Sequence, residues 1–232
     1  MMSVLLCVLA VVSVLQAAAS AQSSPGGIPP RDQLPSVIPI FPLEPPMLFP
    51  GVDRPLHIFE PRYRDMVADA LKGDRIIGMA TLKPGYEAEY AGRPPIYETG
   101  CAGVIVDVEE LPGGRFNIVL RGLVKFRVTS DDQSRAYRLA RIDWMPEALD
   151  EPDRVALRKQ RTRLEELVTR GGQSKVPPGM SDEALVNTIA QYLPLSPADR
   201  QALLELKTTL LRALALIDHI ESTARPRLAV RK

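Results

Sequence analysis

The sequence has little of the side-chain chemistry on which most enzymes and metalloproteins depend. Its 232 residues include two cysteines, Cys7 and Cys101, and two histidines, His57 and His219. The glycine patterns that cradle phosphates are absent, and so are the G-x-S-x-G nucleophile turn, H-E-x-x-H and C-x-x-C. Nothing in the sequence therefore indicates a catalytic residue, a bound metal or a cofactor, and we predict that the chain is not an enzyme.

The sequence also lacks an excess of either charge. Its 29 lysines and arginines nearly balance its 28 aspartates and glutamates, which leaves a formal charge of +1. This balance provides no overall attraction to nucleic acid, which is therefore not an expected partner. RNA binding stays open as an alternative, because six basic residues of the predicted strands can gather on one surface. They are Arg121, Lys125, Arg127, Arg135, Arg138 and Arg141.

Charged side chains are missing altogether from residues 1–22. An apolar run at 4–15 precedes Ala19-Ser20-Ala21, the small-residue pattern of a signal-peptide cleavage site. The run is shorter than the roughly 20 residues that span a membrane, so no stable membrane span is expected. We predict a signal peptide over 1–21 and export to the periplasm or out of the cell. Because the terminal amine is the one positive charge before the run, an uncleaved anchor or a cytoplasmic protein with a misassigned start stays open.

Removal of the signal peptide would leave Cys101 as the one cysteine. It lies in an apolar, strand-like segment, Gly100 to Val104, which predicts a buried structural thiol. No disulfide bond can then form within the mature chain. Residues 22–35 are rich in proline, glycine and serine and are predicted to form a flexible leader.

Residues 36–146 have the pattern of a β-rich subdomain. Pro112-Gly113-Gly114 predicts the reversal of a hairpin, and Gly122 permits a bend in the strand that follows. One amphipathic helix is expected over 62–72, with Pro61 at its start. The expected strands cover 36–40, 55–58, 75–82, 104–109, 115–121, 124–128 and 137–144.

Residues 147–224 change to helical periodicity. Helices are expected over 152–169, after the capping residue Ser181, and over 205–222, with a short turn that begins at Ser196-Pro197. Residues 225–232 form a basic tail. The predicted fold is of the α+β class: a cornered β-barrel with one inserted helix, followed by a C-terminal α-helical subdomain.

Several stretches resemble one known family. IPIFPLEPPMLFPG, from Ile38, and PLHIFEPRYRDM, from Pro55, resemble the start of the N-terminal, substrate-binding domain of Lon protease. VIVDVEELPGGRFNIVLRGLVKFRV and LVNTIAQYLPLSPADRQALLEL follow in the family's order, so the resemblance covers about 36–222. It is closest to standalone bacterial proteins built from this domain, since the sequence contains neither the ATPase nor the Ser-Lys protease domain of Lon. The resemblance implies a PUA-like β-barrel before a helical bundle, binding of unfolded polypeptide, and a homo-oligomer.

We therefore predict a non-enzymatic module that binds unfolded or extended polypeptide as an adaptor or a holdase. The candidate peptide-binding residues are Phe49, His57, Phe59 and Tyr63, because aromatic side chains commonly anchor interfaces. The alternative is that the three aromatic residues fill the core and that His57 makes a structural hydrogen bond. A third hypothesis is a small-molecule sensor in which His57 and Glu60 supply polar groups.

Overall fold

The computed structural model describes residues 34–43, 47–90, 92–132, 134–170, 177 and 179–224. The predicted signal peptide, nearly all of the predicted leader and the basic tail lie outside these residues. Among the helices of the described residues, none is both long enough and apolar enough to cross a membrane.

The strands form one sheet of mixed direction. Its order is β2-β5-β4-β3-β1-β6, and β6 also pairs with β5. Five strands therefore make a closed circuit of pairings, whereas β2 is bonded to β5 from outside the circuit. The β1–β3 pairing is parallel and the others are antiparallel. The strands are β1 (Val37–Leu43), β2 (Asp53–Ile58), β3 (Ile76–Thr81), β4 (Thr99–Leu111), β5 (Arg115–Asp132) and β6 (Arg138–Met145).

The predicted hairpin is confirmed, and its second strand is longer than expected. Gly113 and Gly114 have φ angles of 80° and 68°, which suits a tight reversal between β4 and β5. The sequence predicts two strands on either side of Gly122, but β5 runs through this residue without a break. A register shift opposite Ala102 and Gly103 absorbs the bend, so the two predicted strands are one.

Helix α1 (Pro61–Lys72) agrees with the expected amphipathic helix. Pro61 occupies its first position, where the missing amide costs no intrahelical hydrogen bond. Its buried face consists of Tyr63, Met66, Val67 and Ala70. This face belongs to a hydrophobic core that also takes in the sheet and the C-terminal helices.

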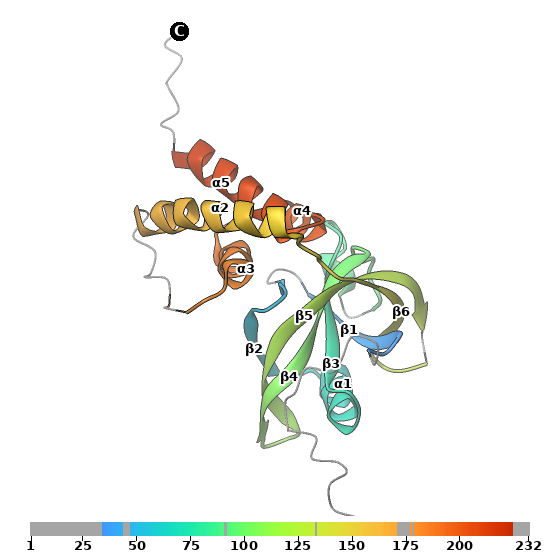
Figure 1. Cartoon of the computed structure of the whole chain (residues 1–232). Helices are drawn as coiled ribbons and strands as arrows, with labels where there is room; N and C mark the ends of the chain where they lie inside the picture. The colour runs from blue at the N-terminus through green and yellow to red at the C-terminus, as the bar shows by residue number, and fades with distance from the viewer. Residues whose placement is uncertain are drawn as a thin grey trace, which may run out of the picture.

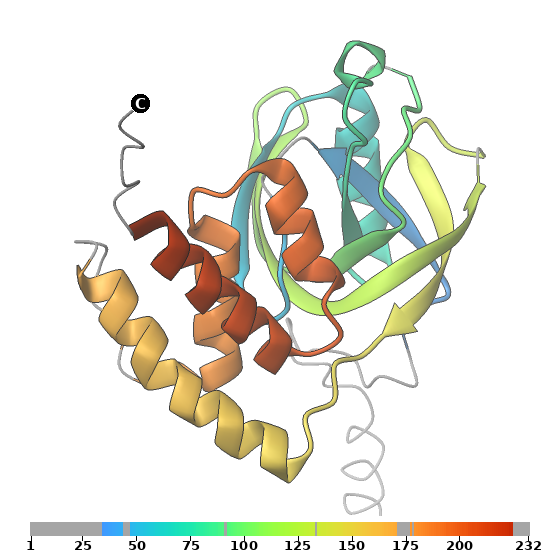
Figure 2. The ribbon, with the colours of Figure 1, turned by 90° about the horizontal axis from the view of Figure 1, so that it is seen from above.

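Four further helices lie on one side of the sheet (Figures 1 and 2). Ser181 and Ser196 cap α3 and α4 as predicted, each accepting a backbone hydrogen bond of 3.1 Å. The predicted turn after Ser196 is a nine-residue helix. The last helix starts at Thr209 and not at 205, because Leu206 is extended and ends α4. The helices are α2 (Glu151–Arg170), α3 (Asp182–Tyr192), α4 (Pro197–Glu205) and α5 (Thr209–Ala224).

The mixed α+β fold class is thus confirmed, with six strands in one sheet and five α-helices in the described residues. Cys101 is fully buried in β4, as predicted for a structural thiol, and this burial raises the pKa of its thiol well above the usual value.

Candidate functional site

Strand β2 forms the open edge of the sheet, since its place in the strand order gives it β5 alone as a neighbour (Figure 1). Pro55 at its centre suits an edge, because proline has no amide hydrogen for a second neighbour. The Asp53 carbonyl oxygen points away from β5 and accepts from Gln191 Nε2 at 3.3 Å and Tyr192 Oη at 3.0 Å. Alternate residues of a strand direct their polar backbone groups to the same side. The amide and carbonyl of His57 therefore face the open side of the edge.

His57 and Phe59 lie together at the far end of this strand. The Phe59 side chain is 61% exposed. Its ring stacks on the His57 ring with 6.0 Å between centroids and 22° between planes. An exposed phenylalanine held against a second ring is the kind of rigid apolar surface that anchors a bound polypeptide.

A relay of hydrogen bonds orients the His57 ring. Asn117 Nδ2 donates to Glu109 Oε2 at 2.7 Å, and a carboxylate can only accept. The Asn117 amide oxygen therefore faces His57, whose Nδ1 lies 2.8 Å away and must donate. The structural hydrogen bond expected for His57 is thus present. Its Nε2 is left as the nitrogen that can meet a ligand.

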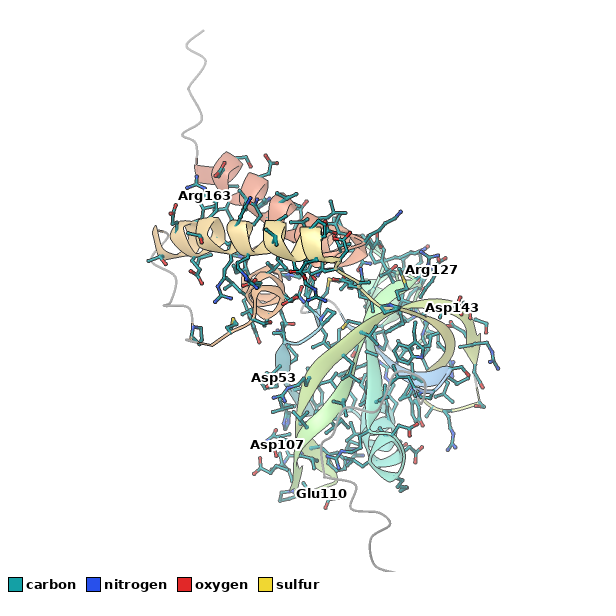
Figure 3. The ribbon with its side chains drawn as sticks, in the orientation of Figure 1. Asp53, Asp107, Glu110, Arg127, Asp143 and Arg163 are labelled. Atoms are coloured by element: carbon teal, nitrogen blue, oxygen red, sulfur yellow. The ribbon has the colours of Figure 1, made fainter. Side chains whose placement is uncertain are left out.

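Beside this pair is a shallow open groove with a volume of about 290 Å³. Leu56, Ile118 and Val119 give it an apolar lining, while Asp107 and Glu109 place two exposed carboxyl groups there. Asp107 lies farther from the C-terminal helices α2 to α5 than Asp53 does (Figure 3). The groove combines apolar surface with a polar rim, as peptide-binding surfaces do.

Phe49 and Tyr63 lie in the core and not on this surface. Tyr63 is 2% exposed; its ring centroid is 4.4 Å from that of Phe41, and the Arg62 guanidinium lies over it at 4.5 Å. Burial is the main cause of the raised pKa of Tyr63. Phe49 is fully buried and donates its amide hydrogen to Gln191 Oε1 at 3.0 Å. The structure therefore brings together two of the four predicted residues, His57 and Phe59.

The structure does not provide the arrangement of side chains that two of the alternative hypotheses need. Glu60 does not face His57 as the small-molecule hypothesis needs, because it pairs with Arg62 at 3.1 Å and accepts from Tyr90 Oη at 3.0 Å. The six basic residues do not form one basic surface: Lys125 is 1% exposed, and Arg138 is 6% exposed. Lys125 is paired with Glu147 at 2.8 Å, and Arg138 is paired with Asp131 at 2.7 Å.

Lys125 belongs to a buried polar group that joins the helices to the sheet. We call it the Glu147 cluster; it contains Lys125, Glu147, Thr209 and Arg212. Glu147 Oε1 lies 2.8 Å from Lys125 Nζ and 2.5 Å from Arg212 Nη2, and its Oε2 accepts from the Thr209 hydroxyl at 2.7 Å. The Lys125 and Arg212 side chains are 2% and 0% exposed. The cluster links β5, the segment after β6, and α5.

The sequence did not indicate this cluster. Lys125 alternates with Val124 and Phe126 and shares a strand face with Arg127, so the period-2 pattern places it in solvent. The structure covers that face with the ends of α4 and α5, and Lys125 Nζ donates to the Leu206 carbonyl oxygen. A strand covered on both faces loses its alternation, because neighbouring residues are then all buried.

A family model for the substrate-binding domain of ATP-dependent protease La (LON) matches residues 37–222. The chain belongs to this family. The match begins with β1 and ends within the last turn of α5, so it includes the β2 edge and the Glu147 cluster. The resemblance predicted over about 36–222 is thereby confirmed.

The relatives of this LON domain are longer proteins. Lon protease 2 of Myxococcus xanthus is 31% identical over 120 residues, which cover 52% of this chain and 14% of that protein. Lon protease 2 of Syntrophobacter fumaroxidans is 25% identical over 205 residues, which cover 84% of this chain and 25% of that protein. The chain thus spans at most a quarter of these relatives.

Two solved structures share the fold of the LON domain. The N-terminal domain of Mycobacterium avium complex Lon protease has a TM-score of 0.61 and 17% identity, over 80% of this chain and 98% of that one. A Lon N-terminal domain protein from Xanthomonas campestris has a TM-score of 0.56 and 24% identity, over 78% and 97%. At these identities the likeness establishes the fold alone.

The Glu147 cluster makes the stability of this LON domain depend on pH. Burial raises the pKa of Glu147, but Arg212, Lys125 and Thr209 outweigh it, so the pKa lies below its ordinary value of 4.5. A carboxyl group with a lowered pKa in the folded state stabilises the fold above its unfolded-state pKa and loses that contribution as the pH falls. We expect Glu147→Gln to be less stable than wild type near neutral pH.

The stability difference between the two proteins should narrow as the pH falls through the lowered pKa of Glu147, because the wild-type carboxyl group then becomes neutral as well. Urea unfolding at a series of pH values measures it. Asp53 and Asp69 also have lowered pKa values, held down mainly by hydrogen bonds from Arg121 and Tyr137. Their contributions to the pH dependence of stability are the same in wild type and in Glu147→Gln, so they cancel in the difference. A difference that stayed constant across this range would contradict the assignment to Glu147.

Proposed function

We propose that this domain binds extended segments of unfolded polypeptide along the open edge of β2. The observation that carries the proposal is the exposed Phe59 ring, stacked on His57 at the end of an edge strand. An added strand would exchange hydrogen bonds with the outward backbone groups of His57, as in other cases of β-strand addition. Phe59 would bury an apolar side chain of the bound segment. The substrate-binding description of the family supports the same class of ligand.

Truncation of Phe59 should weaken binding without weakening the fold. We expect Phe59→Ala to reduce affinity for an unfolded polypeptide about tenfold, the size typical of an aromatic anchor. Its free energy of unfolding should change by less than about 0.5 kcal/mol, because the side chain is mostly exposed. Fluorescence anisotropy with a labelled, cysteine-free unfolded polypeptide measures the affinity.

The matched control for this experiment is Leu211→Ala. Leu211 is an exposed apolar residue of α5, 44% exposed, and its loss should leave the affinity unchanged. If Phe59→Ala and Leu211→Ala both bind the polypeptide as wild type does, the β2 edge is not the binding surface.

The proposed role is that of an adaptor or a holdase, which binds a chain and performs no catalytic step. We propose further that the closed circuit of strands is a PUA-like barrel, within a subdomain 36–146 followed by a helical subdomain 147–224. The pairing of β6 with both β1 and β5 supports the barrel. Assembly into a homo-oligomer is part of the same proposal and rests on the family resemblance.

A further inference from the structure

Two guanidinium groups lie near the C-terminal end of α3, and no carboxyl group of the described residues forms an ion pair with either. They belong to Arg54 of β2 and Arg200 of α4. The Nε atoms of both are buried and have no hydrogen-bond partner. Arg200 is 8% exposed, and Arg54 is partly exposed. Buried charges in proteins are normally paired, so two such arginines near the end of one helix require an explanation.

The C-terminal end of α3 brings the two arginines together. Arg200 Nη2 donates to the carbonyl oxygen of Leu193 at 2.7 Å. Tyr192, the preceding residue, donates its hydroxyl hydrogen to the carbonyl oxygen of Asp53, next to Arg54. Burial lowers the pKa of Arg54, the adjacent Tyr192 hydroxyl opposes this, and the charge of Arg200 lowers it further. Burial likewise lowers the pKa of Arg200.

The nearest acidic side chains along the chain are engaged elsewhere. Asp53 forms a two-point ion pair with Arg121, at 2.6 Å from Nε and 2.8 Å from Nη2. Asp199 Oδ2 accepts from the Ser196 hydroxyl at 2.6 Å, in the cap of α4. The carbonyl end of α3 offsets part of the Arg200 charge. The Tyr192 hydroxyl offsets part of the burial of Arg54, but no carboxyl group of the described residues pairs with it.

We propose that Arg54 and Arg200 together bind one oxyanion, a carboxylate or a phosphate group. Planar guanidinium groups offer paired donors that match the oxygens of both ligands. The site is reachable, since Arg54 is partly exposed and Tyr192 is 54% exposed. An anion there would neutralise two cations that otherwise repel each other. The site does not depend on the proposed polypeptide surface, because neither His57 nor Phe59 takes part in it.

The test follows the Nε–Hε signals of Arg54 and Arg200 by NMR in the full chain, at constant pH and ionic strength. Three probes are titrated separately: inorganic phosphate, a short apolar peptide with a free C-terminal carboxylate, and the same peptide as its C-terminal amide. We expect both signals to shift and saturate with at least one oxyanion, and to stay in place with the amide. The oxyanion that saturates the two signals at the lower concentration shows whether the site prefers a phosphate or a carboxylate.

Variants distinguish binding at this site from a general screening of surface charges by the added ions. Arg54→Gln should weaken the oxyanion at least about tenfold, as the loss of one bidentate partner does. Arg127→Gln should leave the affinity unchanged, since Arg127 is an exposed cation well away from Asp53 (Figure 3). Arg54→Lys keeps the charge but loses the planar fork, should weaken binding severalfold, and serves if Arg54→Gln does not fold.

Three results would overturn the proposal. They are shifts that fail to saturate with either oxyanion, equal affinity in wild type and the Arg54 variants, and an equal loss of affinity in Arg127→Gln. If Phe59→Ala binds the unfolded polypeptide as wild type does, the oxyanion proposal is not affected, because Phe59 lies at the other end of β2.

Discussion

Replacing Glu147 by alanine is expected to lower the free energy of unfolding by about 3–5 kcal/mol, the cost of removing one partner from a buried ion pair. The carboxylate lies between Lys125 and Arg212, whose side chains are 2% and 0% exposed. Without it, two cations remain in the interior with the attractive charge gone. The loss should be large because both side chains are almost fully buried.

Urea denaturation measures this effect, with Glu166→Ala as the matched control. Glu166 also pairs with an arginine, Arg163, but its side chain is 47% exposed. Its removal should cost no more than about 1 kcal/mol, as for most surface ion pairs. If Glu147→Ala were no more destabilising than Glu166→Ala, the Glu147 cluster would not be what holds the helices to the sheet.

Gly122→Ala is the second substitution with a large expected effect, a loss of about 3 kcal/mol or more, at the upper end of overpacking costs. A Cβ atom at this position would lie 2.0 Å from the carbonyl oxygen of Phe49 and 2.8 Å from its carbonyl carbon. These are backbone atoms, so no side-chain rotation relieves the clash. Gly122 also exchanges backbone hydrogen bonds of 2.8 and 2.9 Å with Gly51 and Val52, which set the start of β2.

Gly51→Ala is the control for this substitution, because it lies in the same corner but has room. Its φ angle is +74°, and no atom lies within 4 Å of a Cβ placed there. The expected cost is about 1 kcal/mol, from backbone strain alone. Thermal unfolding should place the two variants in this order; the reverse order would show that the corner does not pack against β5 as described.

Local signals in the sequence predict most of the elements. Pro112-Gly113-Gly114 specifies the hairpin turn, Pro61 the start of α1, and Ser181 and Ser196 the starts of α3 and α4. Each acts through its own backbone conformation or its own hydrogen bond, which neighbouring residues are enough to define. The predicted signal peptide stays a prediction, since it lies outside the described residues.

Tertiary contacts determine the burial and the pairing of several residues for which the sequence has no local signal. Phe49 and Phe59 flank the same strand in similar apolar stretches, yet one is fully buried and the other is 61% exposed. The difference arises because the corner before β2 folds under α3, whereas the segment after β2 turns into α1 at the open edge. Likewise, the sequence does not show that Arg54 of β2 and Arg200 of α4 both lie near the C-terminal end of α3.

Strand β2 thus contributes residues to two candidate binding features. Its open edge leads to His57 and Phe59, where we propose that an apolar segment of polypeptide binds. Arg54, one position on from the Asp53 carbonyl that α3 covers, belongs to the proposed oxyanion site. The two features are separated by about four residues of extended strand, or roughly 13 Å.

The most direct test of the central claim is photo-crosslinking from the β2 edge. A photoreactive phenylalanine analogue is placed at position 59 and, in a second protein, at position 211, another exposed apolar site. Each protein is irradiated with a labelled unfolded polypeptide, with and without an excess of unlabelled polypeptide. We predict a crosslinked product from position 59 that the competitor abolishes, and none from position 211. Equal products from both positions, or a product from position 211 alone, would contradict polypeptide binding at this edge.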